Sequence, residues 1–335
     1  MLHPHKRIRI DNNLSTNKTK SFTIDLSEFN NITTIDQLLN ILNVSQRKQT
    51  NLFINIDTLY NLKEPLIKLN NMIGLNEFKE AIVNMILYYI QGLDNNEMFN
   101  TVLQGPPGCG KTEIAQILAD IYSKLGKLSK GTFTSVKRHD LVAEYLGQTA
   151  IKTNKVLKDA LGGVLFIDEA YSLGNSEKRD SFAKECIDTI NQFLTENADD
   201  FVVIIAGYSE ELKNQFFSMN RGLERRFPWK FKIDNYSNTD LYNIFIKQCS
   251  DANWSVINKK YIESFFEKNY ESFPFFGGDT MTFFYKCKIA HARRSITIPS
   301  HLKRKLSNSD IDNAFILFKS KSDDDDNNTY KFMYI

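Results

Sequence analysis

A glycine-rich segment at residues 105–112 constrains this chain more than any other feature. It reads Gly-Pro-Pro-Gly-Cys-Gly-Lys-Thr, follows a short apolar run at residues 101–104, and precedes a stretch with apolar residues at helical spacing. This order predicts a strand, a tight turn and a helix, in which backbone N–H groups curl around phosphate oxygens and the helix adds its positive end. The alternative, a glycine turn without a nucleotide, is disfavoured by the flanking strand and helix. The predicted P-loop consists of Gly105, Pro106, Pro107, Gly108, Cys109, Gly110, Lys111 and Thr112.

An acidic pair further along the chain predicts chemistry beyond binding. The apolar run at residues 164–167 suits a parallel strand buried on both faces, and Asp168 and Glu169 follow it directly. In such a sheet Asp168 lies beside the P-loop, where it and the Thr112 hydroxyl can ligate Mg²⁺. Lys111 reaches the outer phosphates, and Glu169 is placed to polarise the attacking water. The alternative is an acidic pair that only ends a strand at the surface. From the P-loop and the acidic pair together, we predict ATP and Mg²⁺ as cofactors.

Strand and helix patterns alternate around these two motifs. Apolar runs at residues 133–136 and 201–206 predict further strands, and residues 78–89 and 182–193 predict helices. This alternation predicts an α/β fold with a parallel sheet. Four later segments carry apolar residues at helical spacing and predict a small all-helical lid: residues 241–248, 262–266, 281–294 and 311–318. We assign no role to His291, because a lone histidine on a helix is usually packed or solvated.

The domain organisation follows from these patterns and from composition. Residues 1–20 are polar and basic, which predicts a flexible tail, with a targeting or nucleic-acid-binding arm as the alternative. Residues 21–64 carry a strand pattern at 22–26 and a helix pattern at 35–42, and we expect an N-terminal extension or small adaptor. The remaining expected units are the large α/β nucleotide-binding domain at 65–234, the lid at 235–320 and an acidic tail at 321–335.

Composition narrows the partners and the compartment. Lys and Arg number 42 against 40 Asp and Glu, so the charge gives no support to a nucleic-acid partner. The four cysteines lack any C-x-x-C spacing, which indicates neither a zinc site nor a disulfide framework and favours a reducing interior. No apolar run is long enough to span a bilayer or to form a signal-peptide core. We expect a soluble intracellular protein, located in the cytoplasm, without a membrane partner.

Beyond these patterns, the chain from about residue 66 to residue 320 resembles AAA+ ATPases. Within them it is similar to the branch of the red-type rubisco activases (CbbX, CfxQ) and the sporulation-stage-V ATPases. The matching blocks are residues 105–112, 140–153, 162–173, 205–208 and 220–227. The resemblance implies an AAA+ core followed by a small helical lid. It also implies a homo-oligomeric ring, usually a hexamer, with ATP at subunit interfaces and work on a macromolecule at the central pore.

Two further roles are implied by the resemblance alone. Arg226, which precedes Phe227, matches the family's arginine finger, a guanidinium that stabilises charge on the phosphoryl group of a neighbouring subunit. Its neighbours Arg225 and Arg221 can share or replace this role, and a surface basic cluster is the alternative. Ile73 and Gly74 match the segment that closes over adenine.

The loop after the second strand and the end of the fourth strand also match the family. Tyr145, Leu146 and Gly147 match the aromatic, aliphatic and glycine pore loop that grips substrate, with a packed tyrosine at an ordinary helix-loop junction as the alternative. Tyr208 stands at the sensor-1 place, where many AAA+ proteins have Asn, and its phenol can hydrogen-bond a water.

One departure from the family concerns the sensor-2 helix. Where relatives carry an arginine after Phe-Gly, this chain reads Phe-Gly-Gly-Asp-Thr-Met-Thr-Phe at residues 276–283. Lys286, or Arg293 and Arg294, are the candidates to replace that arginine.

The leading functional hypothesis is an ATPase ring that hydrolyses Mg·ATP to remodel a protein client. A nucleotide-controlled scaffold or switch with little translocation is the first alternative, and a nucleic-acid-remodelling ATPase is the second. The resemblance to rubisco activases does not establish a rubisco client.

Overall fold

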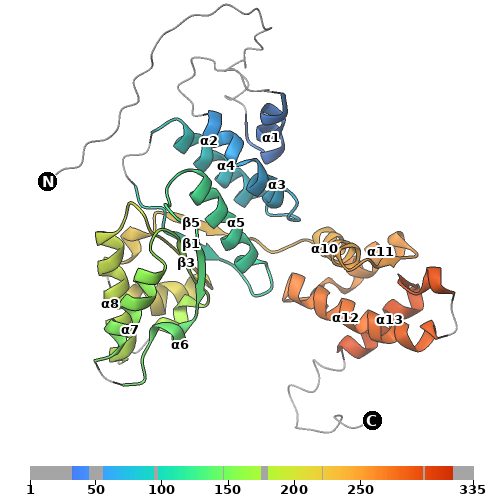
Figure 1. Ribbon diagram of the computed structural model, residues 1–335. Coiled ribbons are helices and arrows are strands. Elements are labelled where there is room, and N and C mark those ends of the chain that lie inside the picture. The colour runs from blue at the N-terminus through green and yellow to red at the C-terminus, as the bar shows by residue number, and fades with distance from the viewer. Residues whose placement is uncertain are drawn as a thin grey trace, which may run out of the picture.

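The computed structural model describes residues 32–44, 56–93, 97–145, 147–174, 180–220, 222–296 and 299–319. The tail expected at residues 1–20, the strand expected at 22–26 and the acidic tail expected at 321–335 lie outside these ranges. Figure 1 shows an α/β unit, a group of N-terminal helices beside it, and a helical unit joined to it by the chain between β5 and α10.

Within the described residues, five parallel strands form the central sheet, in the order β2-β3-β4-β1-β5. In that order their bounds are β2 Phe133–Val136, β3 Val164–Ile167, β4 Val202–Gly207, β1 Thr101–Gln104 and β5 Trp229–Lys232. On β1, Leu103 pairs with Ala206 of β4 and with Phe231 of β5. Because these strands run the same way, their carboxyl ends meet at one edge, where the segment after β1 lies between those that follow β4 and β5.

Helices cover both faces of this sheet (Figure 1). On β4, Ile204 and Ala206 share a core with α4 (Asn76–Ile90) and α5 (Lys111–Lys124). The alternate residues Val203 and Ile205 share a core with α8 (Ser181–Glu196), against which α7 (Thr149–Asp159) packs. The strands β3 and β4 are therefore buried on both faces, as the sequence predicted, whereas β2 is buried only at Val136. Short segments connect these elements: α6 Arg138–Leu141, η2 Ala170–Leu173, α9 Ser209–Glu211, η3 Leu212–Phe216, η4 Phe217–Met219 and η5 Glu224–Arg226.

Three N-terminal helices extend the core on the α5 side. They are α1 (Ile35–Val44), α2 (Ile56–Asn61) and α3 (Lys63–Asn70). Leu38, Leu62 and Leu66 are fully buried, and these helices pack against one another and against α4 and α5. We expected a domain boundary after residue 64, and α3 runs across this position. The division into an N-terminal extension and a large domain stays a prediction.

The helical unit consists of α10 (Asn238–Asp251), α11 (Lys259–Asn269), α12 (Phe276–Ser295) and α13 (Asn308–Lys319). Ser237 caps α10: its hydroxyl accepts from the backbone N–H of Asp240, while the Asp240 carboxylate accepts from the backbone N–H of Ser237. Two short 3-10 turns, η6 (Tyr270–Ser272) and η7 (Ser300–Leu302), and a two-stranded parallel ribbon, β6 (Ser255–Val256) with β7 (Lys305–Leu306), complete the unit.

Aromatic side chains and one polar cluster fill this helical unit. Phe245, Phe266 and Phe283 are buried and make ring contacts with one another. His291 is buried too, with Nδ1 2.9 Å from the Asp310 carboxylate and Nε2 3.0 Å from the Lys303 carbonyl. It therefore has a packing and hydrogen-bonding role within the unit. Within the described ranges, no helix is both long enough and apolar enough to cross a membrane.

Candidate active site

The glycine-rich loop leaves β1, which lies between β4 and β5 in the sheet, and enters α5. Gly108 and Gly110 have φ angles of 72° and 83°, in the left-handed region that glycine adopts without a Cβ penalty. Gly110 is the residue before the first turn of α5. The sequence therefore forms the predicted strand, turn and helix, with the amino end of α5 directly after the turn.

Lys111 is folded back onto its own loop. Its Nζ donates to the carbonyls of Gly105 at 3.0 Å and Pro106 at 2.6 Å, and it lies 5.8 Å from the ring centroid of Tyr208. The ammonium is thus held against the loop by two backbone carbonyl acceptors. Thr112 follows in the first turn of α5 and is exposed.

Asp168 and Glu169 follow β3 at the same edge of the sheet. Asp168 is half-buried and its Oδ1 accepts from the backbone N–H of Glu169 at 3.0 Å. Glu169 is exposed and has a φ of 51°, an uncommon left-handed conformation for a residue with a side chain. This conformation turns the chain sharply after the strand and presents the carboxylate to solvent.

Two tyrosines lie beside this acidic pair. Tyr208 follows β4, the strand between β1 and β3, so it lies between the P-loop and the acidic pair. Its ring centroid is 5.8 Å from that of Tyr171, in the turn after Glu169. Burial, followed by the negative charge of Glu169, raises the pKa of Tyr171 to about 12. Tyr171 carries no signal of its own in the sequence, because its place depends on the turn that Glu169 makes.

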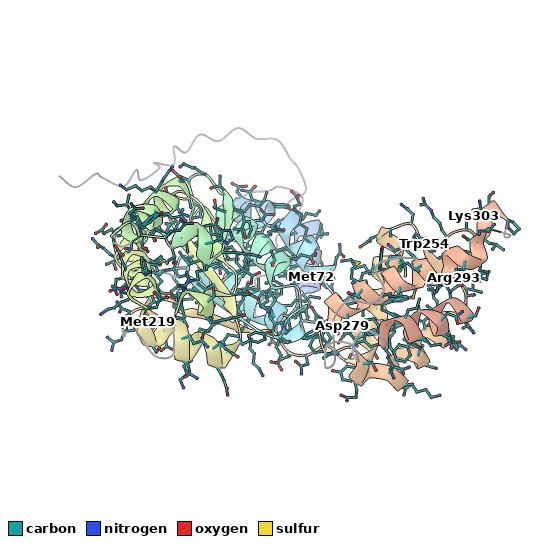
Figure 2. The ribbon with its side chains drawn as sticks, turned by 90° about the horizontal axis from the view of Figure 1, so that it is seen from below. Met72, Met219, Trp254, Asp279, Arg293 and Lys303 are labelled. Atoms are coloured by element: carbon teal, nitrogen blue, oxygen red, sulfur yellow. The ribbon has the colours of Figure 1, made fainter. Side chains whose placement is uncertain are left out.

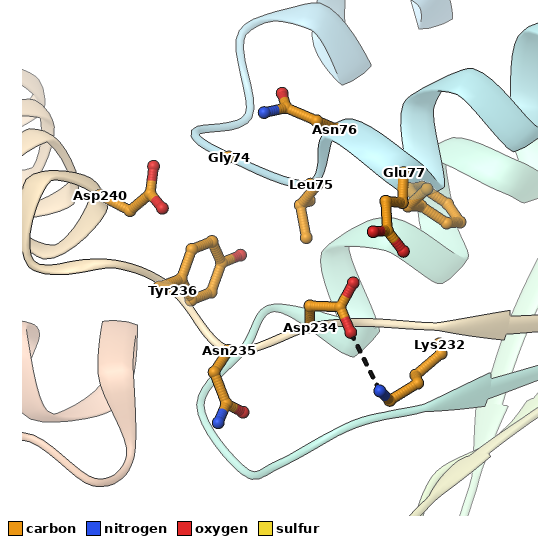
Figure 3. Close-up of a pocket in the computed structure, with 10 residues that line it drawn as sticks. Gly74, Leu75, Asn76, Glu77, Lys232, Asp234, Asn235, Tyr236 and Asp240 are labelled. Atoms are coloured by element: carbon orange, nitrogen blue, oxygen red, sulfur yellow. Dashed lines mark ion pairs between the residues drawn. The ribbon is translucent and has the colours of Figure 1, made fainter.

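A cleft of about 220 Å³ opens between the loop before α4 and the chain that leads from β5 to α10. Figure 3 shows Gly74 and Leu75 on one side of it and Tyr236 and Asp240 on the other. The Tyr236 hydroxyl donates to the carbonyl of Cys109 at 3.1 Å, which joins the cleft to the P-loop. Burial raises the pKa of Tyr236, so this hydroxyl stays protonated and remains a donor.

Of the two residues expected near adenine, the structure places Gly74 in the wall of the cleft, whereas Ile73 is half-buried beside it. Tyr236 is a site residue that sequence reasoning missed. It bonds to a residue far away in the chain, and its local pattern indicated only the start of a helix.

Arg225 and Arg226 lie at the other edge of the sheet. Arg226 precedes β5, and its backbone carbonyl accepts from Nδ2 of Asn100, the residue before β1. Its guanidinium is half-buried and donates to Thr195 Oγ1 at 2.9 Å and to the Gly222 carbonyl at 2.8 Å. Arg225 is exposed. Arg221 lies outside the described residues.

The expected pore loop lies between α6 and α7. Tyr145 is 67% exposed, so its ring is not packed within this chain, and its role in a pore loop stays a prediction. Gly147 has a φ of 78° and provides the bend before α7. Leu146 lies outside the described residues.

The start of α12 reaches the P-loop without a sensor-2 arginine. A Cβ on Gly108 would collide with the carbonyl oxygen of Phe275, and a Cβ on Gly277 would lie 3.0 Å from the carbonyl oxygen of Gly108. Figure 2 shows Asp279 where the two units meet and Arg293 well away from that junction. Arg294 is also remote, because residue 294 lies about 24 Å along the helix from residue 278 at 1.5 Å per residue. Its guanidinium pairs with Asp310 at 2.8 Å. The expectation that Arg293 or Arg294 replaces the missing arginine is therefore wrong, and Lys286 stays a prediction.

Comparison with known proteins identifies the family to which this architecture belongs. Residues 101–234 match the family model described as "ATPase family associated with various cellular activities (AAA)". The putative cfxQ-like protein R730 of Acanthamoeba polyphaga mimivirus is 40% identical over 317 residues, which are 92% of this chain and 78% of that protein.

Two bacterial relatives match a shorter region. Stage V sporulation protein K of Bacillus subtilis is 38% identical over 55% of this chain and 59% of its own length. Protein CbbX of Cereibacter sphaeroides is 41% identical over 45% of this chain and 49% of its own length. The match therefore spans about half of each of these two relatives.

Among solved structures, the AAA domain of FIGL-1 in complex with ADP superposes with a TM-score of 0.56 at 20% sequence identity. The superposition covers 76% of this chain and 87% of that domain, and it supports the fold. The P-loop, the parallel sheet with its helical lid and the long match to the cfxQ-like relative lead to one conclusion: this chain belongs to the AAA+ ATPases, in the branch that contains CfxQ, CbbX and stage V sporulation protein K.

Proposed function

We propose that this ATPase hydrolyses Mg·ATP within a ring of its own copies and uses the cycle to remodel a protein client. The observation that carries the proposal is the division of the candidate residues between two opposite edges of one sheet. The P-loop, Asp168, Glu169 and Tyr208 lie at the carboxyl edge, and Arg226 lies at the amino edge.

The residues at the carboxyl edge fit a nucleotide with Mg²⁺. Gly108 and Gly110 have backbone conformations that let N–H groups face an anion, and the amino end of α5 follows directly. Thr112 and Asp168 offer oxygen ligands, which Mg²⁺ prefers. The bound ion would neutralise charge on the phosphates.

The catalytic steps assigned to this chain follow from those positions. Lys111 exchanges its bonds to the Gly105 and Pro106 carbonyls for bonds to outer phosphate oxygens, which are stronger because both partners are charged. Glu169 accepts a hydrogen bond from the attacking water and orients it. Tyr208 lies between these two groups, where its hydroxyl can hold the same water.

The position of Arg226 supports action on a second copy of the chain. The strand β1 separates the two edges, and its four residues span about 10 Å at 3.3 Å per residue. Hydrogen bonds to Thr195 and Gly222 hold the Arg226 side chain at the amino edge. This separation supports a contact between the guanidinium and the P-loop of a neighbouring copy, rather than that of its own chain. Such a contact joins two different faces of the same chain, and contacts of that kind form rings when they close.

Tyr145 supports the remodelling part of the proposal. Its ring is exposed, in the loop between α6 and α7, and it precedes the bend at Gly147. An aromatic ring offers a large contact area at low entropic cost, so it can hold an extended polypeptide without reading its sequence. In a ring of copies, such side chains would face a common axis and pass nucleotide-driven motion to a client.

The test compares two variants of the nucleotide site. Lys111→Ala should weaken ATP binding, whereas Glu169→Gln should bind ATP like the wild type and lose turnover by roughly 100-fold or more, since it loses its general base. Binding is measured by calorimetry and turnover by phosphate release. The matched controls are Lys124→Ala, in the last turn of α5, and Glu267→Gln, on the exposed side of α11. A Glu169→Gln protein that hydrolyses ATP at the wild-type rate would show that another group polarises the water.

A further inference from the structure

The loop at residues 71–75, between α3 and α4, contacts both halves of the candidate nucleotide site. The methyl group of Met72 would lie 3.5 Å from a Cβ placed on Gly110 of the P-loop. A Cβ on Gly74 would lie 3.2 Å from the ring of Tyr236. Figure 2 shows Met72 at the junction of the two units, and Figure 3 shows the turn at Gly74 facing Tyr236. The shape of this loop therefore sets the wall of the cleft beside the P-loop.

That shape needs support from outside the loop. Gly74 and Leu75 have consecutive left-handed φ angles of 65° and 60°. Glycine adopts this region freely, but a leucine with its Cβ does so only when surrounding contacts hold it there.

Lys79 supplies such a contact from one turn inside α4. Its Nζ donates to the Met72 carbonyl at 2.6 Å and to the Asn70 carbonyl at 3.2 Å, and its backbone N–H donates to the Leu75 carbonyl at 2.8 Å. Asn70 is the last residue of α3, so the ammonium also lies at the negative end of that helix.

The side chain of Lys79 makes these hydrogen bonds in a partly buried position. It is half-buried, and burial lowers its pKa, opposed by the charges of Asp36 on α1 and Asp240 on α10. A cation withdrawn from water in this way makes stronger hydrogen bonds to its carbonyl partners. Lys79 lies behind the loop and is not among the residues that line the cleft.

We propose that Lys79 is a positioning residue for the nucleotide base: it holds the 71–75 loop in the shape that receives the base, without touching the nucleotide. This inference rests on the proposed nucleotide site, in which the phosphates bind the P-loop and the base enters the cleft beside it. If Lys79 has this role, its loss should weaken binding of the base and leave binding of the phosphates unchanged.

The test uses that separation. Lys79→Met keeps the length of the side chain and removes its donors, and it should raise the Kd of ATP about tenfold. The Kd of inorganic tripolyphosphate, which has no base, should change less than twofold. The preference for ATP over GTP should fall, because the loop no longer fixes one shape of the cleft. Lys79→Arg, which retains charge and donors, should restore most of the ATP affinity.

Lys68→Met is the matched control, because Lys68 is an exposed lysine of α3 that pairs with Glu64 and Asp120. It should bind both ligands like the wild type. If Lys79→Met does not fold, Lys79→Gln, which keeps one donating amide, should show the same split with a smaller loss, about threefold.

Two results would overturn the inference: equal loss of ATP and tripolyphosphate, or no loss of either, in a folded Lys79 variant. Failure of the proposed function would look different, since the wild type would then fail to bind ATP or Lys111→Ala would bind it normally.

Discussion

The trans position of Arg226 can be tested by mixing two inactive proteins. Arg226→Ala keeps its P-loop and lacks the guanidinium, and Lys111→Ala has the opposite defect. Loss of the guanidinium should lower turnover by roughly 10³-fold or more, the range known for such arginines. In rings mixed at random in equal amounts, about one interface in four pairs an intact P-loop with an intact Arg226, because heterologous contacts join different faces. Mixed rings should therefore recover about a quarter of the wild-type turnover.

The contacts of Arg226 also predict a change in stability. Its side chain donates to Thr195 and Gly222, and it is half-buried, so removal should cost about 1–2 kcal/mol of the free energy of unfolding. That loss leaves a domain with the usual 5–15 kcal/mol folded, so it cannot explain a 10³-fold loss of turnover. The loss is measured by urea denaturation of the same preparations.

Arg225→Ala is the matched control for these measurements. Arg225 is adjacent and exposed, so its removal should change stability by less than about 0.5 kcal/mol and turnover by less than threefold. If Arg225→Ala abolishes turnover and Arg226→Ala does not, the trans role belongs to Arg225. If mixed rings form and neither arginine variant is complemented by Lys111→Ala, no arginine at the amino edge acts on the P-loop of a neighbouring copy.

Two further outcomes are expected from other parts of the chain. Tyr145→Ala should leave ATP binding and ring assembly intact and abolish processing of a client captured on Glu169→Gln rings; undiminished processing would favour the switch or scaffold. Asp310→Asn should cost about 3 kcal/mol in urea denaturation at pH 7, because this buried carboxylate accepts from Arg294, His291 and Ser307. These contacts hold the pKa of Asp310 well below its usual value, so its contribution is complete above the unfolded pKa of about 3.9 and is lost as pH falls below it. The difference between wild type and variant should shrink at pH 3, and a difference that does not depend on pH would contradict this account.

The parts of the fold that the sequence predicted are those specified by local pattern. The strands β2 and β3 have the bounds expected from their apolar runs, since no helical spacing competes within them. The helix α12 begins five residues before the expected start at residue 281. Gly277, Gly278 and Asp279 are poor helix formers, so propensity alone argues against a helix there. The close approach of Gly277 and Gly278 to the P-loop favours them, and that is a tertiary effect.

The candidate site divides in the same way. The P-loop and the acidic pair are contiguous in sequence, and each motif carries its own chemistry. Tyr236 and Lys79 could not be predicted, because their roles depend on carbonyl groups in other segments, Cys109 for the tyrosine and Met72 for the lysine. The expectation that Arg294 replaces the sensor-2 arginine was wrong because its partner also lies in another segment: Asp310 binds its guanidinium at the far end of α12.

The contact between Phe275 and Gly108 has a mechanical consequence. The helix α12 has 20 residues and is therefore about 30 Å long at 1.5 Å per residue. Because its first turn lies against the P-loop, a change in that loop acts at one end of a rigid rod. A rotation of about 10° at that end moves the other end of a rod about 30 Å long by about 5 Å, roughly one helical turn. An adjustment within the P-loop too small to alter the sheet would thus become a displacement of the lid comparable to the diameter of a side chain.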